Sequence, residues 1–210
     1  MKNTLVTDKN TPSTPHHLVL PTDKTILQTM QHGYRETPRN LSEQIPDLTR
    51  QYAANRLRSL EKRGYMINPG PADRSGMYQI TLQGRVAADK MQYYVRDYDG
   101  LFHQLVQRVC DAQTPDNHPT PSAAIEFDGM IDTTHVDLQT NELEALETLS
   151  NTSGVTIPSQ FSGSLGCSTD ETAAILFSLF FFGLAERHDN IDVYSISDRG
   201  RDYLDELLPS

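Results

Sequence analysis

Two stretches of the chain share one residue pattern, and this internal repeat constrains the fold more than any other feature. The matched positions are Leu57, Leu60, Gly64, Tyr78, Ile80, Gly84 and Arg85 in the first stretch and Leu176, Leu179, Gly183, Tyr194, Ile196, Gly200 and Arg201 in the second. Every interval agrees except the one between the first glycine and the tyrosine, which is three residues shorter in the second stretch. The repeat predicts that one supersecondary unit occurs twice.

Apolar periodicity and capping residues predict the elements of the first copy. The expected elements are helices at about 22–32, 38–45 and 50–63 and strands at 65–67 and 77–81. Proline after Thr37 suits a first helical turn, Thr49 is a good N-cap, and Gly64 is placed to end the third helix. Three helices followed by a β-hairpin is the order of a winged helix-turn-helix.

The second copy carries the corresponding signals. Pro158, Phe161, Leu165 and Ser168 stand where the first copy has Pro38, Leu41, Ile45 and Thr49. We therefore expect a mainly α chain with small β-hairpins (α+β), in which two winged helix-turn-helix units are joined by a long helix and a linker with prolines. The expected division is a disordered tail at 1–21, an N-terminal winged helix at 22–82, a connecting and dimerisation helix at 83–112, a linker at 113–137 and an acidic winged helix-like unit at 138–210.

The net charge of −10 is unevenly distributed along the chain. Residues 22–90 contain eleven Lys and Arg against seven Asp and Glu, whereas residues 113–210 contain three against seventeen. The first half can therefore face phosphate, which the second half would repel. Thirteen Arg against only five Lys, together with the acidic excess, suggest a halophilic, high-salt cytoplasm.

The third helix of the first copy has the composition of a helix that reads a DNA major groove. Ala53, Leu57 and Leu60 share one face, and Gln51, Asn55, Arg58, Ser59 and Lys62 lie opposite, with Tyr52 and Arg56 on the flank. Arg can donate two hydrogen bonds to guanine, and Asn or Gln can pair with adenine. We expect base contacts from the first turns of this helix, namely from Arg50, Gln51, Tyr52 and Asn55. Its N-cap, Thr49, is counted with them among the DNA-binding residues. We expect phosphate or wing contacts from Arg56, Arg58, Lys62, Arg39, Asn40, Arg74 and Ser75. For any single cation, an ordinary solvated helix face is the alternative.

The third helix of the second copy fails this test. It has no Lys or Arg between Ser168 and Phe182 and carries Asp170 and Glu171 where phosphate would lie. Its four phenylalanines predict a patch that a partner covers, most simply a second copy of the chain. The residues expected in the dimer interface are Tyr94, Tyr98, Leu101, Phe102, Leu105, Phe177, Phe180 and Phe181. Coverage within the chain itself is the alternative.

Other function classes find little support. The seven histidines, at positions 16, 17, 32, 103, 118, 135 and 188, have no ligand spacing. We therefore expect no metal, no cofactor and no enzymatic activity. No apolar run is long enough to span a membrane, and no N-terminal signal is present. Cys110 and Cys167 are far apart in sequence, which favours a reducing cytoplasm over a disulfide framework.

Segments from Thr37 to Gly84 resemble archaeal winged-helix regulators, and most of all the haloarchaeal phage phiH-type repressors. The segments that carry the resemblance are TPRNLSEQI, LTRQYAANRL, LEKRGY and YQITLQG. The resemblance covers about a third of the chain and implies a repressor that occupies double-stranded DNA as a homodimer. The acidic second unit is not part of the family pattern.

Two alternatives stay open. The acidic unit could bind a second protein or mimic DNA, with the first unit serving only as a scaffold. The chain could also be an effector- or redox-responsive switch, with a pocket between its halves or with Cys110 as the sensor.

Overall fold

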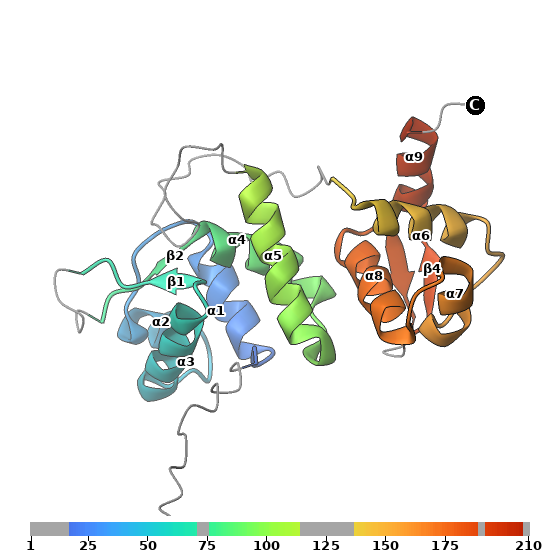
Figure 1. Ribbon diagram of the computed structural model, residues 1–210. Coiled ribbons are helices and arrows are strands. Elements are labelled where there is room, and N and C mark those ends of the chain that lie inside the picture. Colours follow the sequence, from blue (N-terminus) through green and yellow to red (C-terminus); the bar gives the residue numbers. More distant parts are fainter. Residues whose placement is uncertain (1–16, 71–75, 114–136, 189–191, 208–210) are drawn as a thin grey trace, which may run out of the picture.

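The computed structural model describes residues 17–70, 76–113, 137–188 and 192–207, and these are mainly helical with two small antiparallel β-hairpins. The expected class, mainly α with small β-hairpins (α+β), is therefore confirmed. Figure 1 shows an N-terminal unit, residues 17–113, beside a C-terminal unit, residues 137–207. The start of the expected tail, nearly all of the expected linker, and Arg74 and Ser75 lie outside the described residues.

The N-terminal unit begins with three helices and a hairpin. Its elements are α1 (Thr22–Met30), α2 (Pro38–Gln44), α3 (Arg50–Lys62), β1 (Met66–Ile67), β2 (Gln79–Ile80) and α4 (Leu82–Asp89). Thr37 and Thr49 cap α2 and α3, because their hydroxyls accept the N–H groups of Asn40 at 3.2 Å and Tyr52 at 3.3 Å. Gly64, at φ +79°, follows the end of α3 as expected.

The helices of the N-terminal unit enclose one apolar core. Ile26, Leu27, Leu41, Ala53, Leu57 and Leu60 are all 0% exposed. Met66 pairs with Ile80 across the hairpin, and Glu36 forms a further bridge to Tyr78 on the outer side of β2. The core therefore fixes which face of α3 points outward.

The C-terminal unit follows the same order. Its elements are α6 (Thr140–Ser150), α7 (Pro158–Leu165), α8 (Thr169–Phe181), β3 (Ala185–Arg187), β4 (Tyr194–Ile196) and α9 (Asp198–Leu207). Ser168 caps α8 by accepting the N–H of Glu171 at 3.3 Å, and Thr156 bridges to Tyr194. The expected second copy is thus present.

The repeat extends to individual hydrogen bonds. The Thr81 hydroxyl donates to the carbonyl of Gly64 at 2.6 Å and accepts the N–H of Gly84 at 3.0 Å. Ser197 does the same with Gly183 at 2.8 Å and Gly200 at 3.0 Å. A short hydroxyl side chain therefore joins the hairpin to the following helix in both units.

The expected continuous helix over 83–112 is wrong. It is divided into α4, two short 3-10 helices, η1 (Lys90–Tyr93) and η2 (Arg96–Tyr98), and α5 (Asp99–Gln113). Tyr94 and Val95 have extended backbones, which suits an aromatic and a β-branched residue better than a helix does. The break lets Tyr94 donate a hydrogen bond from its hydroxyl to buried Asp99 at 2.9 Å.

Residues just before residue 22 already pack against the N-terminal unit. Leu18 is only 5% exposed and packs on the core, and the Val19 N–H donates to the carboxylate of Asp23 at 2.7 Å. The prediction of a disordered tail up to residue 21 is therefore wrong for residues 17–21.

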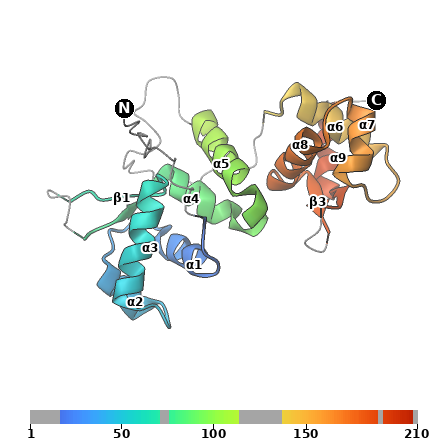
Figure 2. The ribbon, with the colours of Figure 1, turned by 60° about the horizontal axis from the view of Figure 1, so that its bottom comes forward.

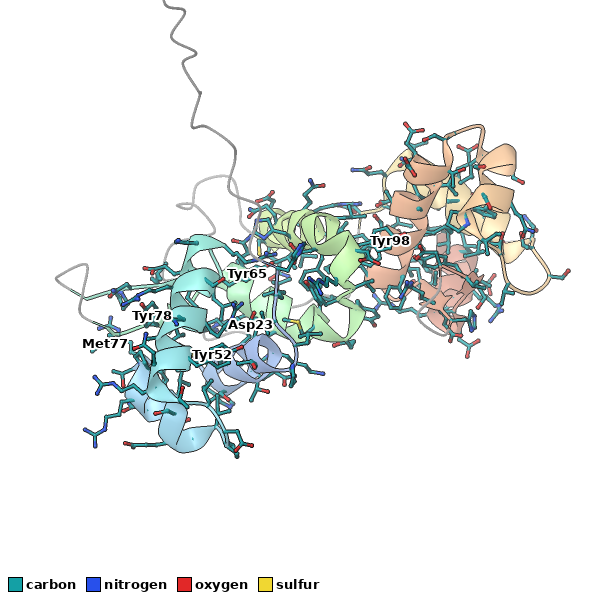
Figure 3. All side chains as sticks on the ribbon, turned by 90° about the horizontal axis from the view of Figure 1, so that it is seen from below. Asp23, Tyr52, Tyr65, Met77, Tyr78 and Tyr98 are labelled. Carbon is teal, nitrogen blue, oxygen red and sulfur yellow. The ribbon has the colours of Figure 1, made fainter. Side chains whose placement is uncertain are left out.

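The two units meet through aromatic rings. Tyr98 of η2 stacks on Phe177 of α8 with ring centroids 4.5 Å apart, and Figure 3 shows Tyr98 at this junction. Phe102 of α5 meets Phe181 edge to face at 5.5 Å. In addition, Arg108 of α5 donates two hydrogen bonds, of 2.8 and 2.9 Å, to Glu142 of α6.

These contacts place half of the residues assigned to a dimer interface in the interior of the chain. Phe102, Phe177 and Phe181 are fully buried and Leu105 is 4% exposed, while Tyr94, Tyr98, Leu101 and Phe180 are half-buried. Phe177 and Phe181 of α8 are covered by η2 and α5 of the same chain, so these two rings are closed to a second copy. Sequence periodicity could not distinguish a partner within the chain from one outside it.

Candidate nucleic-acid interface

The two faces of α3 differ sharply in exposure. Ala53, Leu57 and Leu60 are fully buried, and the other side carries the polar residues. Thr49, Arg50, Gln51, Tyr52, Asn55, Arg58 and Lys62 are all exposed, as predicted. In Figures 1 and 2, α3 lies on the side of the N-terminal unit that is away from the C-terminal unit. This face of α3 is therefore open to a large ligand.

The amides of this face lie side by side at its N-terminal end. Gln51 donates from Nε2 to Oδ1 of Asn55 at 3.4 Å, one helical turn on. Arg50 precedes them, and Tyr52 is 40% exposed beside them. The first turns of α3 therefore present donors, acceptors and one aromatic ring together.

Arg50 and Lys62 form no ion pair with any described residue, so their charges face solvent. Arg58 lies near Tyr78 of the hairpin. Burial and the charge of Glu61 raise the pKa of Tyr78, and Arg58 opposes this. The acidic residue of α3, Glu61, is half-buried and lies at the end of the helix away from the amides.

Helix α2 supplies the two residues expected where it would cross a DNA backbone. Arg39 and Asn40 are exposed at its start. Arg39 forms an i,i+4 pair with Glu43 at 2.9 Å, and both side chains are mostly exposed, so water screens the pair and it is easily exchanged.

Two residues of α3 do not lie where the helical wheel placed them. Arg56 was expected to contact phosphate, but it donates from Nε and Nη2 to the carboxylate of buried Asp23 on α1, at 2.8 and 2.6 Å. Ser59 is 9% exposed and faces the core. The wheel treats α3 as a helix with one packed side, whereas α1 and the hairpin cover its flanks as well.

Sequence reasoning missed the buried ion pairs that hold α3 in place. Arg63, just after α3, donates to both carboxylate oxygens of Asp99 at 3.1 and 3.0 Å, and both side chains are nearly buried. Asp23 has a detectable signal, because it lies three and four residues before Ile26 and Leu27 and so falls on the core-facing stripe of α1. An acidic residue on such a stripe predicts a buried cationic partner.

The C-terminal half of the corresponding face of α8 is closed. With the repeat aligned at Thr49 and Ser168, Arg58 corresponds to Phe177 and Lys62 to Phe181, and both phenylalanines are fully buried at the junction. Asp170 stands where α3 has Gln51. The two equivalent helices of the repeat therefore differ: α3 has an exposed face with cationic residues, and α8 has buried aromatic residues at the matching positions.

The described residues hold no group of three or more His, Cys, Asp or Glu side chains arranged to bind a metal. Within the described ranges, no helix has both the length and the apolar character needed to cross a bilayer. Comparison with known protein families, with curated proteins and with solved structures found no match to this chain.

Proposed function

We propose that the chain is a sequence-specific regulator of transcription that inserts α3 into the major groove of double-stranded DNA. The observation that supports this most directly is the exposed row of Arg50, Gln51, Asn55 and Arg58 on a helix whose opposite face is fully buried. The order of helix, bridged strand, two helices and hairpin is also that of a winged helix-turn-helix, in which the third helix enters the groove.

Each residue has a proposed role. Arg50, Gln51 and Asn55 read base edges, since guanine accepts two hydrogen bonds from Arg and adenine pairs with an amide. The ring of Tyr52 lies against thymine methyl groups or a sugar. Arg58 and Lys62, with Arg39 and Asn40 of α2, contact phosphates, which set the register but carry no sequence information.

The regulator acts in the cytoplasm as a repressor and as a homodimer that places two α3 helices on half-sites about one DNA turn apart. The surface that joins the two copies lies outside the aromatic junction, which is buried within each chain. The C-terminal unit does not contact DNA in this proposal, because it is acidic and the face of α8 is covered.

The test is to select bound sequences from a pool of random duplexes and then to measure affinity by fluorescence anisotropy. Arg50→Ala and Asn55→Ala should each weaken binding to the selected site by about tenfold, the loss of roughly 1–3 kcal/mol expected for a base contact. Arg201→Ala removes an exposed arginine of α9 and is the matched control, which should bind like the unaltered chain.

Two outcomes would contradict the proposal. One is that no duplex is enriched. The other is that Arg50→Ala and Arg201→Ala bind the selected site equally well, which would favour an adaptor that binds another protein through its acidic unit. For phosphate contacts, Lys62→Ala should weaken binding to all duplexes alike and reduce the slope of log affinity against log salt by about 1.

A further inference from the structure

A cavity of about 490 Å³ lies between the two units, bounded by α5 on one side and by α6, α7 and α8 on the other. Its volume falls within the range of sites that hold small organic ligands. The cavity adjoins the aromatic junction, since Leu101 and Leu105 of α5 and Ile175 of α8 line it. A molecule bound there would contact both units at once.

The wall of the cavity combines apolar groups with carboxylates. Leu101, Leu105, Leu165 and Ile175 supply the apolar surface, and the carboxylates come from α6 and α8. The lining is more apolar than polar, which favours a ligand with a hydrophobic body over a small inorganic ion, because burying apolar surface away from water is favourable.

The charged groups in the wall of the cavity determine which sign of ligand charge is favoured. Among the described residues that line the cavity, the one cation is Arg108. It is already occupied, because it binds Glu142 through two hydrogen bonds and also donates to the carbonyl of Asp137. Glu144 and Glu171 form no ion pair with any described residue. The charges left to act on a ligand are therefore negative.

Glu171 is held ionised by its cap. The N–H and the hydroxyl of Ser168 both donate to its Oε2, at 2.9 and 2.7 Å, and these bonds lower the pKa of Glu171. The carboxylate therefore has a fixed position at the start of α8, at the edge of the cavity.

We propose that this cavity binds a hydrophobic organic cation, with the apolar body between α5 and α8 and the charge facing Glu144 and Glu171. Such a ligand stabilises the folded chain because it contacts both units. Any effect of the ligand on DNA binding rests on the function proposed above; binding of the cation does not.

The experiment uses the full chain and two probes of nearly the same shape and opposite charge, tetraphenylphosphonium and tetraphenylborate. Calorimetric titration at one fixed salt concentration should show binding of the cation and not of the anion, and the cation should raise the melting temperature. Replacing both carboxylates, Glu144→Gln with Glu171→Gln, should weaken binding by about tenfold or more. Glutamine retains a polar group that can cap α8.

Two further variants separate a built site from general attraction to an acidic protein. Ala174→Phe places a ring in the cavity and should abolish binding of the cation. Glu186→Gln, at the exposed position of β3 outside the cavity, should leave binding unchanged. Absence of binding, equal binding of both probes, or equal weakening by Glu186→Gln would overturn the proposal. DNA affinity measured without either probe reports on the proposed function independently.

Discussion

Asp23 of α1 and Arg56 of α3 form a buried, two-point ion pair, with Nε–Oδ1 and Nη2–Oδ2 distances of 2.8 and 2.6 Å. Asp23 is 0% exposed and the Arg56 side chain 13%, and Figure 3 shows Asp23 between these two helices. The hydrogen bond to Asp23 is the main cause that raises the pKa of Arg56. The pair fixes the rotation of α3, so one cation of the helix is used to orient it.

Arg56→Ala should therefore act on stability. It leaves the buried carboxylate of Asp23 without its partner, and we expect the free energy of unfolding to fall by about 3–5 kcal/mol in urea titrations. Arg58→Ala, at an exposed position on the same helix, should change the free energy of unfolding by no more than about 0.5 kcal/mol. The double variant Asp23→Ala/Arg56→Ala should lose less than the sum of the single losses. An Arg56→Ala protein of full stability would reinstate Arg56 as a phosphate contact.

The close approach of each hairpin to the following helix makes Gly84 and Gly200 sensitive positions. A Cβ at Gly84 would lie 2.1 Å from the carbonyl oxygen of Tyr65, and one at Gly200 would lie 2.2 Å from that of Leu184. Each alanine variant should lose roughly 1–3 kcal/mol of unfolding free energy, because backbone must move. Gly100→Ala is the control, since nothing lies within 4 Å of its Cβ in α5, and it should gain about 0.5 kcal/mol. Equal effects at the three glycines would contradict this account of the repeat.

His103 makes stability depend on pH. Burial, followed by the charge of Arg63, lowers the pKa of His103, and its Nδ1 lies 3.1 Å from the hydroxyl of Tyr65. Because the folded-state pKa is below the unfolded value of 6.5, the unfolded chain takes up the proton first as the pH falls. The contribution of His103 to stability is therefore fully present above the unfolded-state pKa of 6.5. It is lost as the pH falls below 6.5 and through the lower folded-state pKa. Between about pH 7.5 and 5.5, the free energy of unfolding should vary less with pH in His103→Gln than in the unaltered chain. His32→Gln, at an exposed site, should leave this pH dependence unchanged. If His103→Gln retained the full pH dependence of the unfolding free energy, other groups would be responsible for that dependence.

The two cysteines should differ in reactivity. Cys110 is fully buried, and burial followed by the charge of Asp111 raises its pKa to about 12, so little thiolate forms at pH 8. Cys167 is half-buried, with its Sγ 3.2 Å from the hydroxyl of Thr172. A disulfide reagent should label one thiol per folded chain and both in denaturant, and Cys167→Ser should remove the fast reaction. Rapid labelling of Cys110 in the folded chain would support the redox-switch alternative.

Local patterns predicted most of the elements and the open face of α3. Capping by Thr37, Thr49 and Ser168 and the glycine after α3 are short-range signals, so they could be recognised without the fold. The break at Tyr94 and Val95 was missed because the apolar stripe continues across it, although an aromatic and a β-branched residue suit an extended backbone.

The residues assigned to the dimer interface show the same limit. The phenylalanines of α8 were expected to be covered by a second copy of the chain, but Tyr98 of the same chain, far away in sequence, stacks on Phe177. Arg56 was misplaced for a related reason, since only the packing of α1 brings Asp23 beside it. The buried stripe of a helix can be predicted from its own sequence, but the elements that cover its flanks, and so the burial of residues such as Arg56 and Ser59, cannot.

The closed face of α8 has a consequence for symmetry. A chain with a duplicated unit could present the same helix face twice. Here the second of these faces joins the two units instead, through Phe177 against Tyr98 and Phe181 against Phe102. If α3 binds DNA as proposed, each chain therefore supplies one reading helix despite its internal repeat, and both halves of a palindromic site can be read only by two separate chains.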